Sequence, residues 1–213
     1  MSVTFCCHFD FSFLFFMILG LDLAAKEYNP TGVCFLKSNI ALLQFAISDD
    51  EILQKIRQNT LELIAIDAPL SFENRVCDKQ LKYLGAMPLN LPSISQLAQR
   101  AKNITNKIKN INIIEVFPTG TAKILRIYSK NISEYKRNLQ SLINSELPKK
   151  VNKHLIDAFL SALTGLLYLN KLTLSVGEQE SFIIIPNPND YTIIVDFIKK
   201  LNIKIELAKE WSF

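Results

Sequence analysis

Cysteine, histidine and glycine are scarce in this chain of 213 residues, and each shortage argues against a class of function. The four cysteines form no Cys-x-x-Cys pair and there are only two histidines, so the spacing of a structural zinc site is missing. The six glycines are not clustered, which argues against glycine-rich phosphate loops. We expect free thiols in a reducing, cytoplasmic setting.

Positive charge is missing from the N-terminal segment, where Phe11 to Leu21 is apolar. No Lys or Arg precedes Lys26, so the basic leader of a signal peptide is absent, and the run is shorter than the roughly 20 residues that span a bilayer. We therefore expect no membrane partner. The run continues into a strand expected from Met17, which suggests Met17 as the start and residues 1–16 as a non-native or disordered extension.

The chain has enough apolar residues for a folded domain, because 49% of it is hydrophobic. Its formal net charge of +4 permits contact with nucleic acid without requiring it. Short apolar segments alternate with longer periodic ones, which is typical of an α/β domain. We expect this domain over residues 17–186, with a helical insert at about 71–110, and a C-terminal helix and tail (187–213) packed on it.

The strands and helices can be placed from these patterns. Strands are expected at 17–24, 33–36, 40–47, 61–68, 111–117 and 182–185, and helices at 48–59, 75–84, 93–109, 122–128, 133–145, 151–169 and 191–201. The first three strands have short links and should form an antiparallel meander, whereas the later ones follow helices and should be parallel. The prediction is a mixed five-stranded sheet with the first strand in its middle.

Three acids stand inside otherwise apolar strand segments. They are Asp22, Asp67 and Glu115. A carboxylate in a buried strand is costly unless it is paired, hydrogen-bonded or bound to metal. Because open α/β sheets carry their ligand sites at the carboxyl ends of the strands, we expect these acids to meet in one crevice.

The helix expected at 151–169 adds a fourth acid. His154 and Asp157 are three residues apart and so share a helix face. His154 is a candidate orienting group, substrate contact or proton shuttle, or else an ordinary surface histidine. Clustered carboxylates repel one another, and oxygen ligands without thiols favour Mg²⁺ or Mn²⁺ over Zn²⁺. The expected metal ligands are Asp22, Asp67, Asp157 and Glu115.

An ordered set of short motifs resembles the predicted ribonuclease-H-like nucleases grouped as domain of unknown function 429. The matching segments are Gly20 to Ala24, Pro30 to Gly32, Ile66 to Leu70, Arg75 to Asp78, Ile114 to Thr119, Asp157 to Ala162 and Ile184 to Pro186. They cover most of residues 17 to 186. The resemblance implies a ribonuclease-H-like sheet with acids on the first and fourth strands and on the last core helix.

The activity that this resemblance implies is hydrolysis of phosphodiester bonds in DNA or RNA by two metal ions roughly 4 Å apart, bridged by Asp22. Asp78 is expected to anchor Arg75 and Glu51 to cap a helix, so Glu115 takes the place of the glutamate that ribonucleases H carry on that helix. The candidate substrate contacts are Arg75, Arg100 and Thr31. A homodimer is left open.

Two other functions compete with this prediction. One is a non-catalytic nucleic-acid-binding or scaffold domain of the same fold. The other, ranked lower, is a phosphotransferase of the actin-like ATPase fold, which needs more chain and more glycine-rich motifs than this sequence offers.

Overall fold

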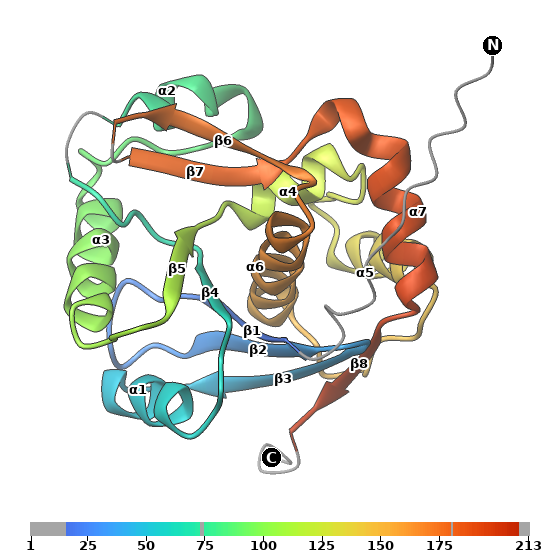
Figure 1. The fold of residues 1–213 in the computed structure, drawn as a ribbon, viewed down its shortest axis with the longest axis horizontal. Coiled ribbons are helices and arrows are strands. Elements are labelled where there is room, and N and C mark those ends of the chain that lie inside the picture. The colour runs from blue at the N-terminus through green and yellow to red at the C-terminus, as the bar shows by residue number, and fades with distance from the viewer. Residues whose placement is uncertain (1–15, 73–74, 180, 209–213) are drawn as a thin grey trace.

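The computed structural model describes residues 16–72, 75–179 and 181–208, and it is built around a mixed sheet of six strands (Figure 1). The strands of this sheet are β1 (Met17–Asp22), β2 (Thr31–Lys37), β3 (Ile40–Ala46), β4 (Leu63–Ile66), β5 (Asn112–Glu115) and β8 (Lys204–Leu207). Their order is β5-β4-β1-β2-β3-β8. β1 is antiparallel to β2 and parallel to β4, which confirms the predicted meander and the central place of the first strand.

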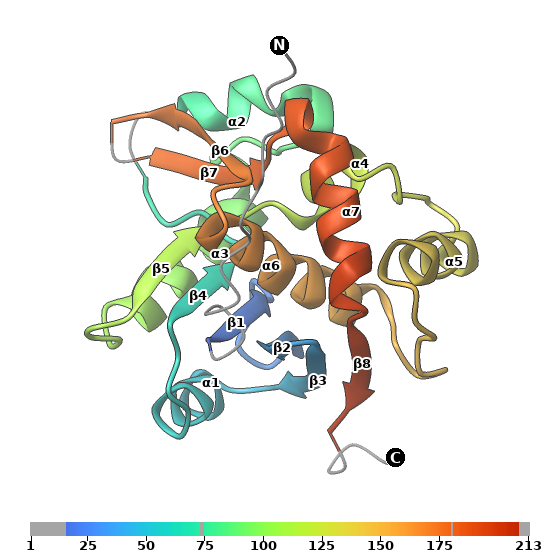
Figure 2. The same ribbon diagram turned by 45° about the vertical axis from the view of Figure 1, so that its right-hand side comes forward.

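The predicted number of strands was wrong, because β8 extends the sheet. The helix α7 (Tyr191–Leu201) leads into β8, which pairs in parallel with β3 (Figure 2). The tail after the helix expected at 191–201 was an open candidate for a terminal strand, and its residues Lys204–Leu207 form one with alternating burial. A separate hairpin of β6 (Thr173–Glu178) and β7 (Ser181–Pro186) also contains one strand, β6, that the sequence did not predict.

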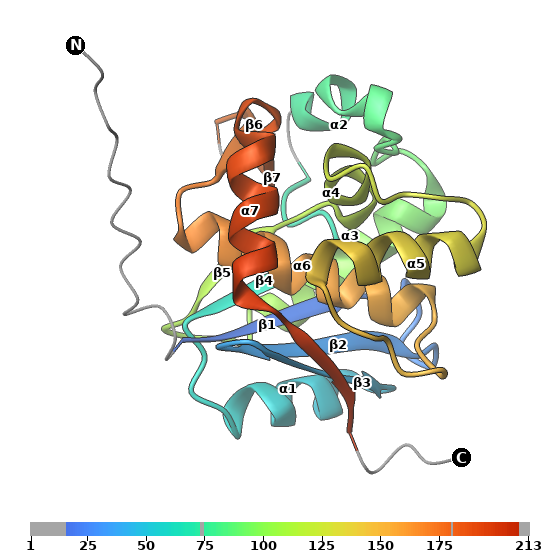
Figure 3. The same cartoon turned by 90° about the vertical axis from the view of Figure 1, so that its right-hand side faces the viewer.

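Helices cover both faces of the sheet, as Figure 3 shows for α1 on one side and α6 on the other. The helices are α1 (Asp49–Arg57), α2 (Val76–Gln80), α3 (Pro92–Thr105), α4 (Pro118–Ile124), α5 (Ile132–Ile143), α6 (Lys153–Leu169) and α7, with short 3₁₀ turns at Lys82–Leu84 and Pro188–Asp190. Successive side chains of β1 point to opposite faces of the sheet and so belong to two parts of the hydrophobic core. Leu19 and Leu21 pack with α1 and α3 on one face, whereas Ile18 packs with α6 on the other.

The sequence explains where several helices begin. The Ser48 side chain accepts a hydrogen bond from the Glu51 N–H, and the Glu51 carboxylate accepts one from the Ile47 N–H, so Glu51 caps α1 as predicted. The helix expected at 122–128 begins earlier, because Pro118 opens α4 at its first turn, where a missing N–H costs nothing.

Two glycines let α6 lie unusually close to the central strands. A Cβ atom on Gly20 of β1 would stand 2.2 Å from the Ala158 carbonyl oxygen, and one on Gly32 of β2 would stand 2.4 Å from that of His154. Only glycine fits at such distances, and the close approach places the first turns of α6 beside the end of β1. No helix in the described part of the chain is both long and apolar enough to cross a membrane.

Candidate functional site

A pocket of about 270 Å³ opens where β1 and β4 end and α6 begins. Asp22 is the last residue of β1, and Asp67 directly follows β4, whose strand lies in parallel register beside β1. The Asp67 N–H donates to the Leu21 carbonyl oxygen at 2.9 Å, which continues the ladder one residue past β4. Asp157 reaches the same pocket from the second turn of α6. The structure therefore brings together the three aspartates predicted from sequence.

These three residues, Asp22, Asp67 and Asp157, are called the aspartate group below. Two of them contact a basic side chain from the first turn of α6. His154 Nδ1 lies 2.6 Å from Asp22 Oδ2, and Lys153 Nζ bonds to Asp157 Oδ2. Asp157 is only 3% exposed, yet its other carboxylate oxygen, Oδ1, has no hydrogen-bond partner among the described residues. A buried carboxylate oxygen without a hydrogen-bond partner destabilises the folded state, so this end of the pocket contains an acceptor that a ligand could satisfy.

The electrostatics of the aspartate group disfavour its full ionisation. Burial, followed by the charges of Asp22 and Asp157, raises the pKa of Asp67 well above its ordinary value. Burial raises the pKa of Asp157 to about 6, although the Lys153 ammonium opposes this shift. The hydrogen bond to Asp22 raises the pKa of His154. Perturbed groups that meet in a concave site are typical of functional sites.

The donor atoms of the aspartate group suit a hard divalent cation, because all are carboxylate oxygens. Within the described residues, however, no three or more His, Cys, Asp or Glu side chains are already grouped so as to hold a metal ion. The carboxylates of Asp22 and Asp157 instead contact His154 and Lys153. The donor chemistry and the unpartnered Asp157 Oδ1 fit Mg²⁺ or Mn²⁺, and binding would require the three side chains to close around the ion.

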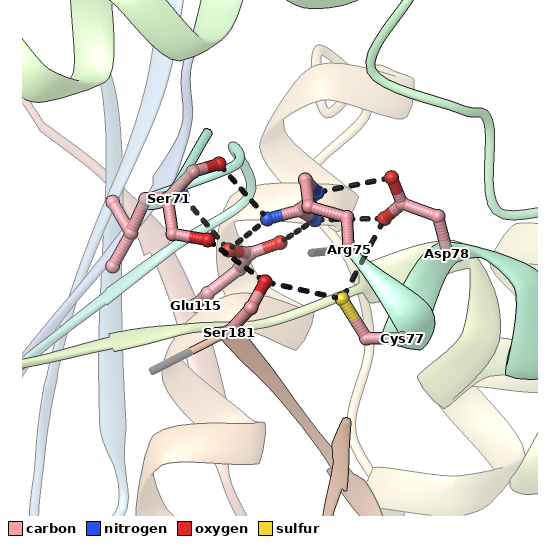
Figure 4. Close-up of polar contacts among 7 residues, drawn as sticks. Ser71, Arg75, Cys77, Asp78, Glu115 and Ser181 are labelled. Atoms are coloured by element: carbon pink, nitrogen blue, oxygen red, sulfur yellow. Dashed lines mark hydrogen bonds and ion pairs between the residues drawn. The ribbon is translucent and has the colours of Figure 1, made fainter. Parts of the chain in front are cut away.

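The remaining two acids that line the pocket belong to a different arrangement, called the Arg75 cluster below and shown in Figure 4. Arg75 lies between Glu115 and Asp78. Its Nη2 is 2.5 Å from Glu115 Oε1 and 2.8 Å from Asp78 Oδ1, and its Nε is 2.9 Å from Asp78 Oδ2. Its Nη1 donates to Glu115 Oε2 at 3.1 Å. The Leu70 N–H also donates to Glu115 Oε2, at 2.8 Å.

These contacts change two expectations from sequence. Glu115 was expected to bind metal, but both of its oxygens accept hydrogen bonds from Arg75. Arg75 was expected to hold phosphate, but its contacts to Glu115, Asp78 and the Ser71 carbonyl engage all five guanidinium N–H donors. The cluster thus ties α2 and the segment after Asp67 to β5. The prediction that Asp78 anchors Arg75 agrees with this geometry.

Arg100 and Thr31, the other expected substrate contacts, lie outside the lining of this pocket. The Arg100 guanidinium donates to Asp49 Oδ1 at 2.8 Å and to the Ala24 carbonyl oxygen at 2.6 Å. Thr31 is fully buried, and its hydroxyl accepts from the Ala24 N–H. Both residues therefore hold the segment between β1 and β2 in place and do not line the pocket.

Lys153 is the functional candidate that sequence reasoning missed. It stands four residues before Asp157, the spacing at which oppositely charged side chains meet on a helix. That spacing was a usable signal. The helical insert expected at about 71–110 also lines the pocket, through residues 85–87 and through Ile94 and Leu97 of α3.

Comparisons with protein-family models, with curated proteins and with solved structures find no match for this chain. The resemblance described from the sequence motifs therefore stays a prediction. The pocket and the strand order that assembles it are the features that bear on function.

Proposed function

We propose that this chain is a metal-dependent nuclease that hydrolyses phosphodiester bonds of nucleic acid. One observation carries the proposal: three aspartates from β1, from the end of β4 and from α6 line one pocket, and a buried oxygen of Asp157 has no partner among the residues that the structure describes. Carboxylates that converge and repel one another are stabilised most simply by a bound cation. We propose the cytoplasm as its location, as expected from the sequence.

The topology supports the finer part of this proposal, a ribonuclease-H-like fold. A meander of β1, β2 and β3, with β4 and β5 added in parallel beside β1, is the sheet that the sequence motifs imply. The additional strand β8 lies at the far edge, beyond β3, and leaves the end of β1 unchanged. The absence of matching family models leaves the assignment as a proposal.

Each part of the site has a role in this reaction. Asp22, Asp67 and Asp157 would hold Mg²⁺ or Mn²⁺, which when bound supplies an activated water and stabilises the charge on the leaving oxygen. His154 orients the Asp22 carboxylate through its Nδ1 contact, and its exposed ring remains accessible to substrate. The apolar wall that includes Ile94 and Leu97 excludes water from one side of the pocket.

The proposal is tested by cleavage of a mixed panel of nucleic acids. Single-stranded, duplex, hybrid and four-way-junction substrates are incubated with Mn²⁺, with Mg²⁺ or with chelator. The Asp67→Asn protein is expected to lose more than the roughly 10–100-fold that removal of an outer partner of a metal site costs. Asp196→Asn, which changes an exposed acid on α7, is the matched control and should cut like the wild type.

The outcome also distinguishes the competing functions. Metal-dependent cutting that Asp67→Asn abolishes supports the nuclease and names its substrate class. Equal inertness of wild type and Asp67→Asn on every substrate, with nucleic acid still bound, would favour a binding or scaffold role.

A further inference from the structure

The charge in the pocket is more nearly balanced than the number of acids suggests. Five acidic side chains line the pocket, but two of them, Asp78 and Glu115, are paired with Arg75. Only the three carboxylates of the aspartate group remain. The Lys153 ammonium already bonds to one of these, Asp157.

The contacts from α6 also reduce the number of oxygens that an ion can use. Asp22 Oδ2 contacts His154, and Asp157 Oδ2 contacts Lys153. The oxygens left on these two side chains are Asp22 Oδ1 and the unpartnered Asp157 Oδ1, besides the carboxylate of Asp67. Such a set can hold one hard cation together with water. Two cations bridged by Asp22, as expected from the sequence, would need the Oδ2 atom that contacts His154.

We propose that Lys153 takes the place of a second cation, so that the pocket binds a single divalent ion. This inference rests on the proposed function and replaces the two-ion arrangement expected from the sequence. Three carboxylates carry three negative charges, which the lysine ammonium and one divalent ion together would neutralise. A second divalent ion would instead lie beside a fixed ammonium, where like charges repel strongly in a partly buried site.

Lys153 is also placed to contact substrate. Its side chain lines the pocket and is about half exposed, whereas that of Asp157 is almost fully buried, so a substrate can reach Lys153 from solvent. An ammonium has three N–H donors, and the bond to Asp157 uses one of them. The others can donate to a phosphate oxygen of the strand to be cut. Lys153 would then supply, on the chain itself, the positive charge that a second ion gives to the leaving group.

The test measures how many ions bind. Isothermal titration of Mn²⁺ into the full chain should give one ion per chain for the wild type. Lys153→Gln removes the ammonium and should raise this number to two. Lys153→Arg keeps the charge and should restore one ion, and Lys200→Gln, an exposed lysine on α7, is the matched control and should also bind one.

The outcomes separate this inference from the proposed function. Two ions bound by wild type and by Lys153→Gln alike would overturn the role of Lys153 and leave the nuclease standing. No saturable binding of Mn²⁺ by the wild type would overturn the proposed function, and this inference with it. Circular dichroism checks that each variant is folded, and if Lys153→Gln does not fold, two ions in wild type or in Lys153→Arg still overturn the inference.

Discussion

The Arg75 cluster and the aspartate group line the same pocket, but they differ in how completely their charges are compensated. In the Arg75 cluster, one guanidinium uses all of its donors on two buried carboxylates and a carbonyl. In the aspartate group, a buried oxygen of Asp157 has no partner within the described part of the chain, and burial together with the charges of Asp22 and Asp157 raises the pKa of Asp67. The difference separates acids that hold the fold together from acids left ready for a ligand.

Opposite effects on stability should follow from this difference. A buried ion pair contributes little net stability, but the loss of one partner leaves an uncompensated charge and is strongly destabilising. Removing a charge from a group of mutually repelling carboxylates should instead relieve the folded state.

Arg75→Met should give the largest loss of stability. It leaves Glu115 and Asp78 buried without their cation, so the free energy of unfolding should fall by about 3–5 kcal/mol at neutral pH. Urea unfolding followed by circular dichroism measures this change. Lys79→Met removes an exposed lysine from the same helix and is the control for the change in net charge.

The loss of stability in Arg75→Met should also depend on pH. At lower pH the two carboxylates can take up protons, so the loss should shrink as the pH falls. A variant as stable as Lys79→Met at neutral pH would show that the Arg75 cluster does not carry the stability assigned to it.

Glu115 and Asp67 show why the sequence could not separate the two regions. Each is an acid at the end of a short apolar strand, and both were expected to bind metal. The difference comes from Arg75, which is 40 residues from Glu115 in sequence and reaches it only because the insert folds back over β5. A pattern within one segment carries no information about such a partner, whereas the convergence of Asp22 and Asp67 followed from strand order. Asp157 joins them because α6 packs closely on β1.

The pH dependence of stability should come chiefly from the aspartate group. The pKa of Asp157 is about 6 in the folded chain, against 3.8 ordinarily. Between these values the folded state keeps a proton that the unfolded chain has lost, so the free energy of unfolding falls as the pH rises from 3.8 to about 6. The total cost is at most on the order of 3 kcal/mol. Urea unfolding in chelator across this range measures it.

Asp157→Asn is the variant that assigns this pH dependence. It removes the titrating carboxyl, so its stability should change less over the same range than that of the wild type. Asp196→Asn, at an exposed position, should keep the wild-type slope. An unchanged slope in Asp157→Asn would assign the dependence to other groups.

Asp67→Asn should raise stability where the Arg75 variant lowers it. The amide removes the repulsion from Asp22 and Asp157, so without metal the free energy of unfolding should increase by roughly 0.5–2 kcal/mol. Saturating Mn²⁺ should reverse the order, because only the wild type gains stability from binding the ion. Thermal unfolding with chelator tests the expected gain in stability, and thermal unfolding with Mn²⁺ tests the reversed order. If Asp67→Asn is less stable than the wild type in chelator, the repulsion assigned to the aspartate group is contradicted.

The fold was easier to predict than the site, because strands are recognised within one segment whereas the site depends on contacts between segments far apart in sequence. The core strands β1 to β5 are apolar runs bounded by turn residues, and each can be read locally. The close contact of α6 with β1 depends on Gly20 meeting the backbone of Ala158, far away in sequence. The strand β8 is as long as β4 and β5, but its place in the sheet depends on its partner β3, which is far away in sequence.

Ser71→Ala should give the smallest effect and tests whether charge, rather than hydrogen bonding in general, holds the Arg75 cluster. The Ser71 hydroxyl donates to Ser181 Oγ at 2.8 Å, and its loss should lower the free energy of unfolding by about 0.5–1.5 kcal/mol, since the Cys77 thiol still lies 3.6 Å from Ser181 Oγ. Urea unfolding compares it with Ser133→Ala, an exposed control on α5, while Mn²⁺ binding should stay unchanged. A loss as large as that of Arg75→Met would mean that the neutral bonds, not the ion pairs, fix the insert.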